Sequence, residues 1–162
     1  MELLPFDEYV RSLPRRRMAA GVLLRDDAGR VLLVEPSYKR FWDIPGGVVE
    51  AGEPPWDAAA REVREEIGLD RRPGPLLVID NLSATDRMPD GLMFVWDGGP
   101  ITASEVDTLT LTDPEIVSAS LHTPEQAAAK VPSSLAARLD SAVHAADTGT
   151  LALCQDGHRT TA

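Results

Sequence analysis

The chain has 162 residues, of which 43% are hydrophobic, and its formal net charge is −10. This length predicts one domain with a substantial core, and the composition excludes an intrinsically disordered chain. No apolar run approaches the roughly 20 residues of a membrane-spanning helix, and the acidic balance argues against a protein that grips nucleic-acid phosphates. The single cysteine, Cys154, excludes an internal disulfide, so we expect a cytoplasmic protein in a reducing compartment.

We expect one folded domain between two terminal segments. Residues 1–15 lack the long apolar core of a secretory signal, so they predict an N-terminal extension. Residues 16–150 predict the domain itself, with no internal repeat and no low-complexity linker. Residues 151–162 predict a flexible tail, because chain ends tend to fray.

Five short apolar segments predict strands. Residues 18–24 (MAAGVLL) and 31–35 (VLLVE) flank a stretch of turn formers and predict a β-hairpin. Residues 76–80 and 91–96 predict two more strands, separated by a polar loop. Residues 115–121 alternate apolar and polar side chains, which is the pattern of a half-buried strand.

Two helices are predicted after the last of these strands. Residues 123–126 (TPEQ) form a capping box with proline at the first helical position. Ser134 is expected to cap a longer helix that ends near Gly149. Its apolar side chains recur at helical spacing: Leu135, Leu139 and Val143. Together these elements predict an α+β fold, in which helices pack on a mixed β-sheet.

Residues 54–68 predict a further helix, because prolines suit its start and Gly68 suits its C-terminal cap. Side chains at helical spacing form one apolar arc that should face the sheet: Trp56, Ala59, Ala60, Val63 and Ile67.

Three carboxylates stack on another face of this helix, at Glu62, Glu65 and Glu66. Like charges at this spacing destabilise an isolated helix by roughly 0.2–0.5 kcal/mol per pair, and Arg61 alone cannot neutralise three of them. One interpretation is a solvated acidic face, since glutamate is a good helix former. The other is a site for a hard divalent cation such as Mg²⁺, which prefers a few carboxylates, retained waters and substrate phosphates. The preceding loop, residues 45–53, contains three glycines and Glu53 and can bring backbone close to this acidic face.

Residues 47–69, GVVEAGEPPWDAAAREVREEIGL, match the Nudix box G-x5-E-x7-R-E-U-x-E-E-x-G-U, where U is aliphatic. The match includes every fixed position: Gly47, Glu53, Arg61, Glu62, Val63, Glu65, Glu66, Gly68 and Leu69. Residues 41–46 also resemble the segment that precedes the box in this family. The chain therefore resembles the Nudix hydrolases, which implies an α/β/α sandwich over about residues 16–147.

The resemblance implies an enzyme that hydrolyses a diphosphate linkage in a nucleoside diphosphate joined to another group. Glu62, Glu65 and Glu66 would bind Mg²⁺ or Mn²⁺, and Glu53 would support the metal site. Arg61 would orient these carboxylates, and the carbonyl of Gly46 or Gly47 is a further candidate ligand. The alternative is a Nudix-fold module that binds a nucleotide without turnover.

Candidate residues outside the helix are less specific. In the family that the chain resembles, the general base is either a glutamate of the box or one from a loop outside it. Glu115, in the loop before the strand at 116–121, is the best candidate outside the box, and the alternative is a solvated residue at the start of that strand. Lys39 or Arg40 could bind a distal phosphate, although surface positions are an equal alternative. Three aromatic side chains could stack on a nucleotide base: Trp42, Phe41 and Phe94. For Phe94, packing in the core is the favoured interpretation.

The substrate is not defined by the sequence. Residues 84–86 lack the proline typical of ADP-ribose pyrophosphatases and the tyrosine typical of diadenosine polyphosphate hydrolases. Cys154 is far from the box, which disfavours the chemistry of the isopentenyl diphosphate isomerase branch. We expect a small-molecule diphosphate, most simply a nucleotide, as partner, with no nucleic acid duplex, no membrane and a possible homodimer. Residues 76–128 contain one basic and nine acidic residues, and only Glu115 among them is assigned to chemistry.

Overall fold

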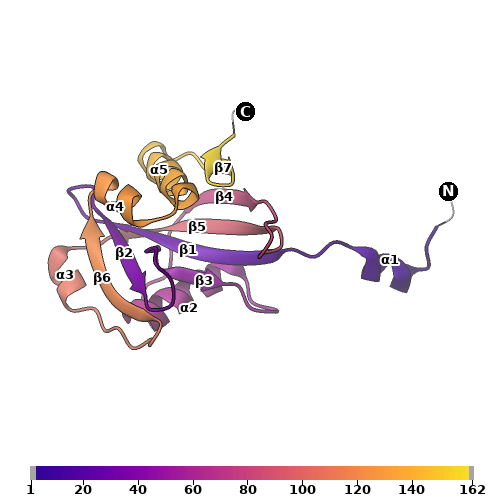
Figure 1. Ribbon diagram of the computed structural model, residues 1–162, viewed down its shortest axis with the longest axis horizontal. Coiled ribbons are helices and arrows are strands. Elements are labelled where there is room, and N and C mark those ends of the chain that lie inside the picture. Colours follow the sequence, from indigo (N-terminus) through magenta and orange to yellow (C-terminus); the bar gives the residue numbers. More distant parts are fainter. Residues whose placement is uncertain (1–2, 161–162) are drawn as a thin grey trace.

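A computed structural model describes residues 3–160. One mixed β-sheet lies between two helical layers, with α2 on one face and α4 and α5 on the other (Figure 1). The predicted α+β class and the α/β/α sandwich are therefore confirmed. Within the described residues, no helix is long and apolar enough to cross a membrane.

The sheet has eight strands in the order β6-β2-β1-β5-β4-β7-β8, and β3 pairs with β1 beside this path. The strand bounds are β1 Arg17–Arg25, β2 Val31–Pro36, β3 Gly46–Val48, β4 Leu76–Leu82, β5 Gly91–Pro100, β6 Ile116–His122, β7 Ala152–Gln155 and β8 His158–Arg159. The helix bounds are α1 Phe6–Ser12, α2 Pro55–Ile67, α3 Ala103–Asp107, α4 Pro124–Lys130 and α5 Ser133–Thr148.

The five predicted strands are all present. β1 and β2 pair antiparallel with Arg25 opposite Val31, which confirms the predicted hairpin. β4 and β5 also pair antiparallel, whereas β1 and β5 run parallel, so the sheet is mixed. β3 was not predicted as a strand, because three residues rich in glycine show no apolar periodicity.

Successive side chains of β1 enter opposite cores. Val22 and Leu24 pack with Val63 and Ile67 of α2, whereas Leu23 packs with residues of α5. This alternation follows from the pleat of a strand, and it explains why a strand covered on both faces reads as a continuous apolar run.

The helix at 54–68 is confirmed as α2, and Gly68 ends it in the left-handed conformation at φ 69°. One part of the predicted apolar face is wrong. Trp56 is 59% exposed although it shares a helical face with Val63 and Ile67, because it lies in the first turn, at the end of the buried stripe. The buried residues of α2 also include Glu66. The stripe therefore includes a carboxylate that the sequence pattern assigned to the acidic face.

The capping box at the start of α4 is confirmed, since Thr123 and Gln126 exchange the two reciprocal hydrogen bonds. Ser134 is not the cap of α5. Pro132 holds that position with extended backbone and without a side-chain hydrogen bond, so Ser134 lies inside the helix. Gly149 ends α5 as predicted, at φ 70°.

The prediction of a flexible tail at residues 151–162 is wrong for the part of this segment that the structure describes. Residues 152–155 form β7, which runs parallel to β4, and β8 folds back on it. Ala152 and Cys154 point into the core and are buried, because alternate residues of a strand face the same side of the sheet and these two fill the space beside α5. Residues 161–162 lie outside the described residues.

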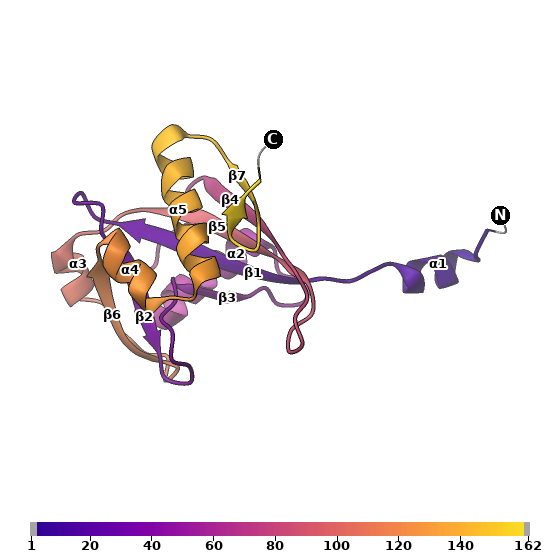
Figure 2. The ribbon, with the colours of Figure 1, turned by 45° about the horizontal axis from the view of Figure 1, so that its top comes forward.

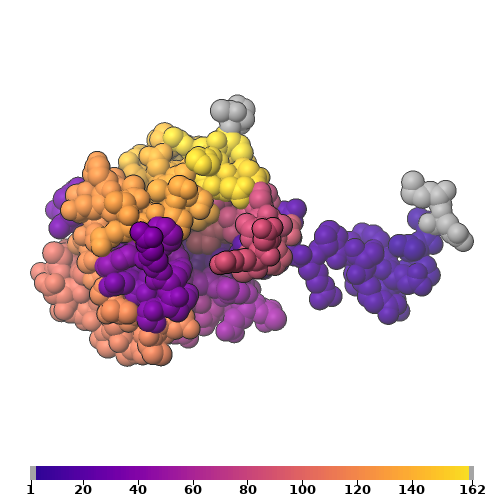
Figure 3. All heavy atoms as spheres, viewed as in Figure 1, coloured from indigo at the N-terminus to yellow at the C-terminus, as the bar shows by residue number. Residues whose placement is uncertain are grey.

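The expected N-terminal extension contains the short helix α1, which has no buried residue. Figures 1 and 2 show α1 standing away from the sheet on an extended linker. The space-filling view in Figure 3 shows the same separation.

Candidate active site

The candidate site is formed where β3 passes the N-terminal half of β1 and faces α2. Gly46 pairs with Gly21 and Gly47 pairs with Ala20 across the β1–β3 ladder. The loop after β3 then returns the chain to the start of α2, so the glycines of the box and its glutamates are brought face to face.

Both glycines are needed for this close approach. A Cβ on Gly47 would overlap the carboxylate of Glu62. A Cβ on Gly46, which has φ 153°, would overlap the carbonyl oxygen of Ala20 and lie 2.6 Å from Cα of Gly21. Gly46 therefore lets two backbones pack together, whereas Gly47 leaves space for the side chain of Glu62 on α2.

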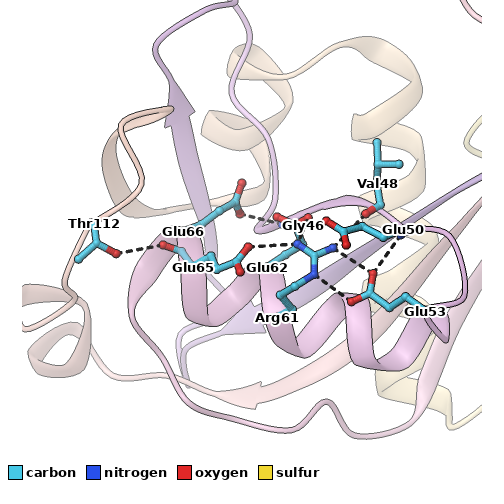
Figure 4. A network of polar contacts seen from close by, with 9 residues as sticks. All are labelled: Gly46, Val48, Glu50, Glu53, Arg61, Glu62, Glu65, Glu66 and Thr112. Carbon is cyan, nitrogen blue, oxygen red and sulfur yellow. Dashed lines mark hydrogen bonds and ion pairs between the residues drawn. The ribbon is translucent and has the colours of Figure 1, made fainter.

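Arg61 is the centre of a polar network drawn in Figure 4. Its guanidinium donates two hydrogen bonds to Glu53, from Nε to Oε1 at 2.9 Å and from Nη2 to Oε2 at 3.1 Å. Nη1 donates to Glu62 Oε1 at 2.8 Å and to Glu65 Oε2 at 3.1 Å. Nη2 also donates to the carbonyl of Val48 at 3.1 Å. One cation thus orients three carboxylates and ties α2 to β3.

This network divides the carboxylates by their electrostatics. Hydrogen bonds from Arg61 hold the pKa of Glu53 below its ordinary value, and the same pairing raises the pKa of Arg61. Burial raises the pKa of Glu62, although Arg61 opposes the shift. Glu53 is therefore a fixed anion that positions Arg61, whereas Glu62 is a carboxylate kept partly out of water.

Glu66 is the most strongly perturbed group in the site. It is 9% exposed, and its Oε2 accepts a hydrogen bond from the Gly46 amide at 2.8 Å. Burial raises its pKa to about 8, and the charges of Glu62, Asp43 and Asp113 add to the shift. Within residues 3–160 this buried carboxylate has several anionic neighbours and forms no ion pair, which is the environment of a carboxylate able to bind a cation.

The donor set fits a hard divalent cation. Glu62, Glu65 and Glu66 provide carboxylate oxygens on adjacent turns of α2, and such oxygens are the ligands that Mg²⁺ and Mn²⁺ prefer. Among residues 3–160, no three acidic, histidine or cysteine side chains are already gathered as a metal-binding cluster. Instead Arg61 holds two of these carboxylates, so a bound cation would compete with the guanidinium for them.

The loop before β6 lies against the same end of α2. Thr112 donates from its hydroxyl to the carbonyl of Glu65 at 3.4 Å. Asp113 is close enough that its charge contributes to raising the pKa of both Glu62 and Glu66. Glu115, the residue expected from the sequence, is exposed, and its carbonyl accepts from the Ser37 amide at 2.7 Å. Its charge is felt by Tyr38 and is not among the main influences on Glu66. Asp113 thus lies near the glutamates although the sequence pattern did not indicate it. The only feature of the sequence that could have suggested Asp113 is its position two residues before Glu115.

The loop between β2 and β3 borders the site with one cation. Nζ of Lys39 lies 2.6 Å from Oδ2 of Asp43. Burial lowers the pKa of Lys39, but the pairing with Asp43 outweighs burial and raises it above its ordinary value. Glu66 contributes in the same direction, so Lys39 lies near the buried carboxylate. Arg40 instead lies over the ring of Phe41 at 5.7 Å and is exposed. Of the two candidate phosphate-binding residues, Lys39 is the one that the structure places beside the glutamates.

The candidate stacking residues lie elsewhere. Trp42 packs edge-on against His122 at 5.1 Å, with Nζ of Lys130 4.1 Å from its ring centroid. It therefore belongs to the α4 side of the sheet. Phe94 is partly buried in the core beneath α2, which agrees with the packing interpretation.

A cleft of about 420 Å³ borders the network on the outer surface of α2. Trp56 and Arg64 line it from the helix, and Arg72 and Pro73 line it from the loop that follows. Glu53 and Arg61 form its inner edge. This cleft is separate from Glu66, so it adjoins the positioning pair rather than the buried carboxylate.

Comparisons with known proteins agree with this geometry. The model of the NUDIX domain family matches residues 15–143. An RNA pyrophosphohydrolase of Pseudomonas fluorescens is 34% identical over 77 residues, which are 48% of this chain and 48% of that protein. A MutT-like protein of Streptomyces ambofaciens is 46% identical over 50 residues, covering 31% of this chain and 32% of that protein. The match thus spans less than half the length of these curated relatives.

Solved structures extend the similarity over most of the chain. The MutT protein of Methanosarcina mazei superposes with a TM-score of 0.66 and 25% identity. That match covers 85% of this chain and 99% of the other. Since the family model spans β1 to β6, α2 and most of α5, which is well over half of the chain, the chain belongs to the Nudix family.

Proposed function

We propose that this protein is a divalent-cation-dependent hydrolase that cleaves a phosphoanhydride bond in a small nucleoside diphosphate derivative. The observation that supports this most is the imbalance of charge at α2. Arg61 is shared among Glu53, Glu62 and Glu65, whereas Glu66 forms no ion pair with any described residue. A purely structural network would match its buried charges, because unmatched buried charge is costly.

Under this proposal the residues divide into ligands and positioning groups. Glu62, Glu65 and Glu66 would hold Mg²⁺ or Mn²⁺, with the carbonyl of Gly46 as a further candidate ligand. When bound, such an ion neutralises phosphate charge and lowers the pKa of a coordinated water. Arg61 and Glu53 would act through the ligands, since Arg61 sets the positions of Glu62 and Glu65.

Two carboxylates compete for the role of general base. Glu115 is exposed and its backbone is fixed by Ser37, whereas Asp113 lies where its charge influences Glu62 and Glu66. A general base must reach the attacking water, so the position of Asp113 favours it. We expect Asp113→Asn to lower turnover at least tenfold, and Glu115→Gln to lower it less. A larger loss of turnover in Glu115→Gln than in Asp113→Asn would instead assign the general base to Glu115.

Lys39 is the proposed contact for a substrate phosphate, because it lies near Glu66 and its pairing with Asp43 keeps it charged. A lysine supplies a mobile point charge suited to phosphate. We expect Lys39→Met to raise KM more than it lowers kcat. Arg40→Met, on the neighbouring residue, is the matched control.

The central experiment measures phosphate release, coupled to a phosphatase where needed, with Mg²⁺ or Mn²⁺. The panel contains nucleoside triphosphates and their oxidised forms, nucleotide sugars, ADP-ribose, dinucleotides and prenyl diphosphates. RNA with a 5′-triphosphate is included because of the name of the Pseudomonas fluorescens relative. We expect turnover of a small nucleotide, and an exclusive preference for RNA would contradict the proposed substrate class.

The role of the acidic face is tested by Glu65→Gln and Glu66→Gln. Each is expected to lower turnover at least tenfold with the fold intact, since tenfold corresponds to about 1.4 kcal/mol of lost transition-state stabilisation. Asp57→Asn, an exposed carboxylate in the first turn of the same helix, is the matched control. Near-normal rates in both glutamine variants would show that this face does not bind the metal.

The second candidate function is a nucleotide-binding module without turnover. The intact Glu62, Glu65 and Glu66 set favours the enzyme, because a sensor has no need of a water-activating site. Nucleotide binding by calorimetry, with no turnover over the whole panel, would establish this alternative and overturn the proposed hydrolase.

A further inference from the structure

The N-terminal arm, residues 3–16, presents an exposed apolar stripe, and none of the residues of its helix α1 is buried. Phe6, Tyr9, Val10 and Leu13 recur at the i, i+3, i+4 and i+7 positions of one helical face, and they are 76%, 52%, 40% and 44% exposed. Leu3 and Leu4 extend the exposed stripe at 90% and 56%. Monomeric proteins rarely expose contiguous apolar surface of this kind without a partner for it.

The helix itself also requires a partner. α1 has seven residues, and isolated helices shorter than about 12 residues are marginal in water because nucleation is unfavourable. Its N-cap, Pro5, provides no side-chain hydrogen bond. An amphipathic helix of this length gains its stability by packing its apolar face.

A groove of matching character lies between α4 and α5. It has a volume of about 370 Å³, and it is predominantly apolar. Its walls and floor consist of Val31, Pro124, Ala127, Ala128, Ala136, Leu139 and Val143. Three of these side chains are alanines, which keep the groove shallow enough for a helix face to lie in it, as in helix-in-groove recognition.

The charges at the rim are complementary to those at the C-terminal end of the arm, whereas the first turn of α1 carries Asp7 and Glu8. At the rim, Asp140 already forms a long, exposed ion pair with Arg159 at 3.8 Å. Glu125 and Asp140 border the groove and are exposed. Arg11 and Arg15 lie on the arm and are exposed, and neither forms an ion pair within residues 3–160. Such complementary charges orient an encounter and fix its register more than they add affinity.

The arm cannot lie in the groove of its own chain. It leaves the sheet at Arg17, whereas Val31 on the groove floor is next to Arg25, at the other end of β1. The nine residues of β1 span roughly 26 Å. Four linker residues, fully extended, and the seven-residue helix together span roughly 24 Å, so only the tip of α1 could reach the groove edge.

We propose that two copies of this chain exchange their N-terminal arms, so that α1 of each copy packs its apolar stripe into the α4–α5 groove of the other. Reciprocal exchange satisfies both stripes and both grooves in a closed two-fold dimer, the commonest form of symmetric assembly. The groove lies on the face of the sheet opposite α2, so this association does not depend on the proposed hydrolase activity.

Cysteine cross-linking distinguishes exchange from folding back. Two full-length variants are mixed under mild oxidation, Phe6→Cys in a tagged chain and Ala128→Cys in an untagged chain. We expect a disulfide-linked heterodimer, resolved by mass without reductant. Ser12→Cys, on the polar face of α1, replaces Phe6→Cys as the control and should cross-link far less. The double variant Phe6→Cys/Ala128→Cys should yield linked dimers, and a monomer closed by an internal disulfide would overturn the exchange.

Light scattering after size-exclusion chromatography provides the second test. We expect wild-type protein to be a dimer at micromolar concentration, and Phe6→Ser/Tyr9→Ser to be a folded monomer. Val143→Glu, in the groove, should also be monomeric, whereas His144→Glu, exposed on the adjacent position of α5, should remain dimeric. A wild-type monomer, or dimers in every variant, would overturn the proposal. Unfolding midpoints identify misfolded variants, and the Phe6→Ser/Tyr9→Ser result then decides, because α1 is not part of the core.

Discussion

The two faces of the sheet handle buried carboxylates in opposite ways. On the α5 face, Asp80 is fully buried and pairs with one cation, with Nε of Arg138 2.7 Å from its Oδ2. Its Oδ1 has no hydrogen-bond partner among the described residues, so the charge of Asp80 is matched although its hydrogen bonding is incomplete. On the α2 face, Arg61 is divided among three carboxylates, and Glu66 accepts only the Gly46 amide. A one-to-one buried pair leaves no net charge to neutralise, whereas an excess of carboxylates leaves capacity to bind a cation.

The faces also differ in what a single change should do. Asp80 and Arg138 join β4 to α5 far from the box, so their loss should affect stability. The α2 network is assembled around a proposed reaction, so changes there should lower turnover more than they destabilise the protein. Sites that bind metal commonly sacrifice stability in this way. The four predictions below test this division.

The largest effect is expected from Arg138→Met. Removing one partner of a buried ion pair costs about 3–5 kcal/mol, because the other charge remains buried without compensation. We expect a loss of unfolding free energy in this range, measured with urea, and normal turnover per folded molecule. The double variant Asp80→Leu/Arg138→Met should recover part of the loss. A stable Arg138→Met protein would show that the pair is not structural.

Gly46→Ala should mainly lower stability, whereas Gly47→Ala, at the adjacent residue, should mainly lower turnover. A Cβ at Gly46 meets the backbone of Ala20 and Gly21, so this variant should lose about 1–3 kcal/mol of stability. A Cβ at Gly47 meets only the carboxylate of Glu62, which can move. Gly47→Ala should therefore fold, with turnover roughly tenfold lower and a raised requirement for Mg²⁺. Equal loss of stability in both variants would contradict this distinction.

The pH dependence of stability should identify Glu66. Its folded pKa of about 8 lies above the ordinary carboxyl value of 4.5, so the folded state holds a proton that the unfolded state releases. Its contribution is complete below about pH 4.5 and is lost as the pH rises through about 8. With a chelator present, the unfolding temperature of wild type relative to Glu66→Gln should fall across this interval. Mg²⁺ should reverse that fall, and a constant difference would contradict the raised pKa.

The smallest effect is expected from Trp56→Ala. The side chain is 59% exposed in the first turn of α2, and surface substitutions usually change stability by no more than about 0.5 kcal/mol. Val63→Ala, two turns later and fully inside the stripe, should cost several times more. Denaturant unfolding of the two variants measures the contrast. A large rise in KM for Trp56→Ala would instead assign the outer cleft to substrate binding.

The regular elements could be predicted because their patterns are local. The apolar runs of β1 and β2, the capping box of α4 and the glycine stop at Gly68 each follow from a few consecutive residues. The helix α3 carries the same kind of signal, since Thr102 and Glu105 form a capping box, but it was missed. The strands β3 and β7 could not be predicted, because three or four residues become a strand only when a neighbouring strand accepts their hydrogen bonds.

The composition of the candidate site could also be predicted, whereas its electrostatics could not. The spacing of the box placed Glu62, Glu65 and Glu66 on one helix with Arg61. It could not show that the two neighbouring glutamates differ in burial. Glu66 is buried against Gly46, whereas Glu65 is half exposed and pairs with Arg61. Nor could it bring Asp113 and Lys39 to the same carboxylate, since these residues come from loops distant in the chain.

By itself, then, the sequence determined the family, the helix that carries the glutamates and the residues able to bind a cation, because each depends on short-range spacing. Only the tertiary structure decided which carboxylate is buried, which carboxylates pair with Arg61 and which side of α2 faces solvent. Burial and charge coupling arise between segments far apart in the chain, so they exist only once β3, α2 and the loop before β6 have packed together.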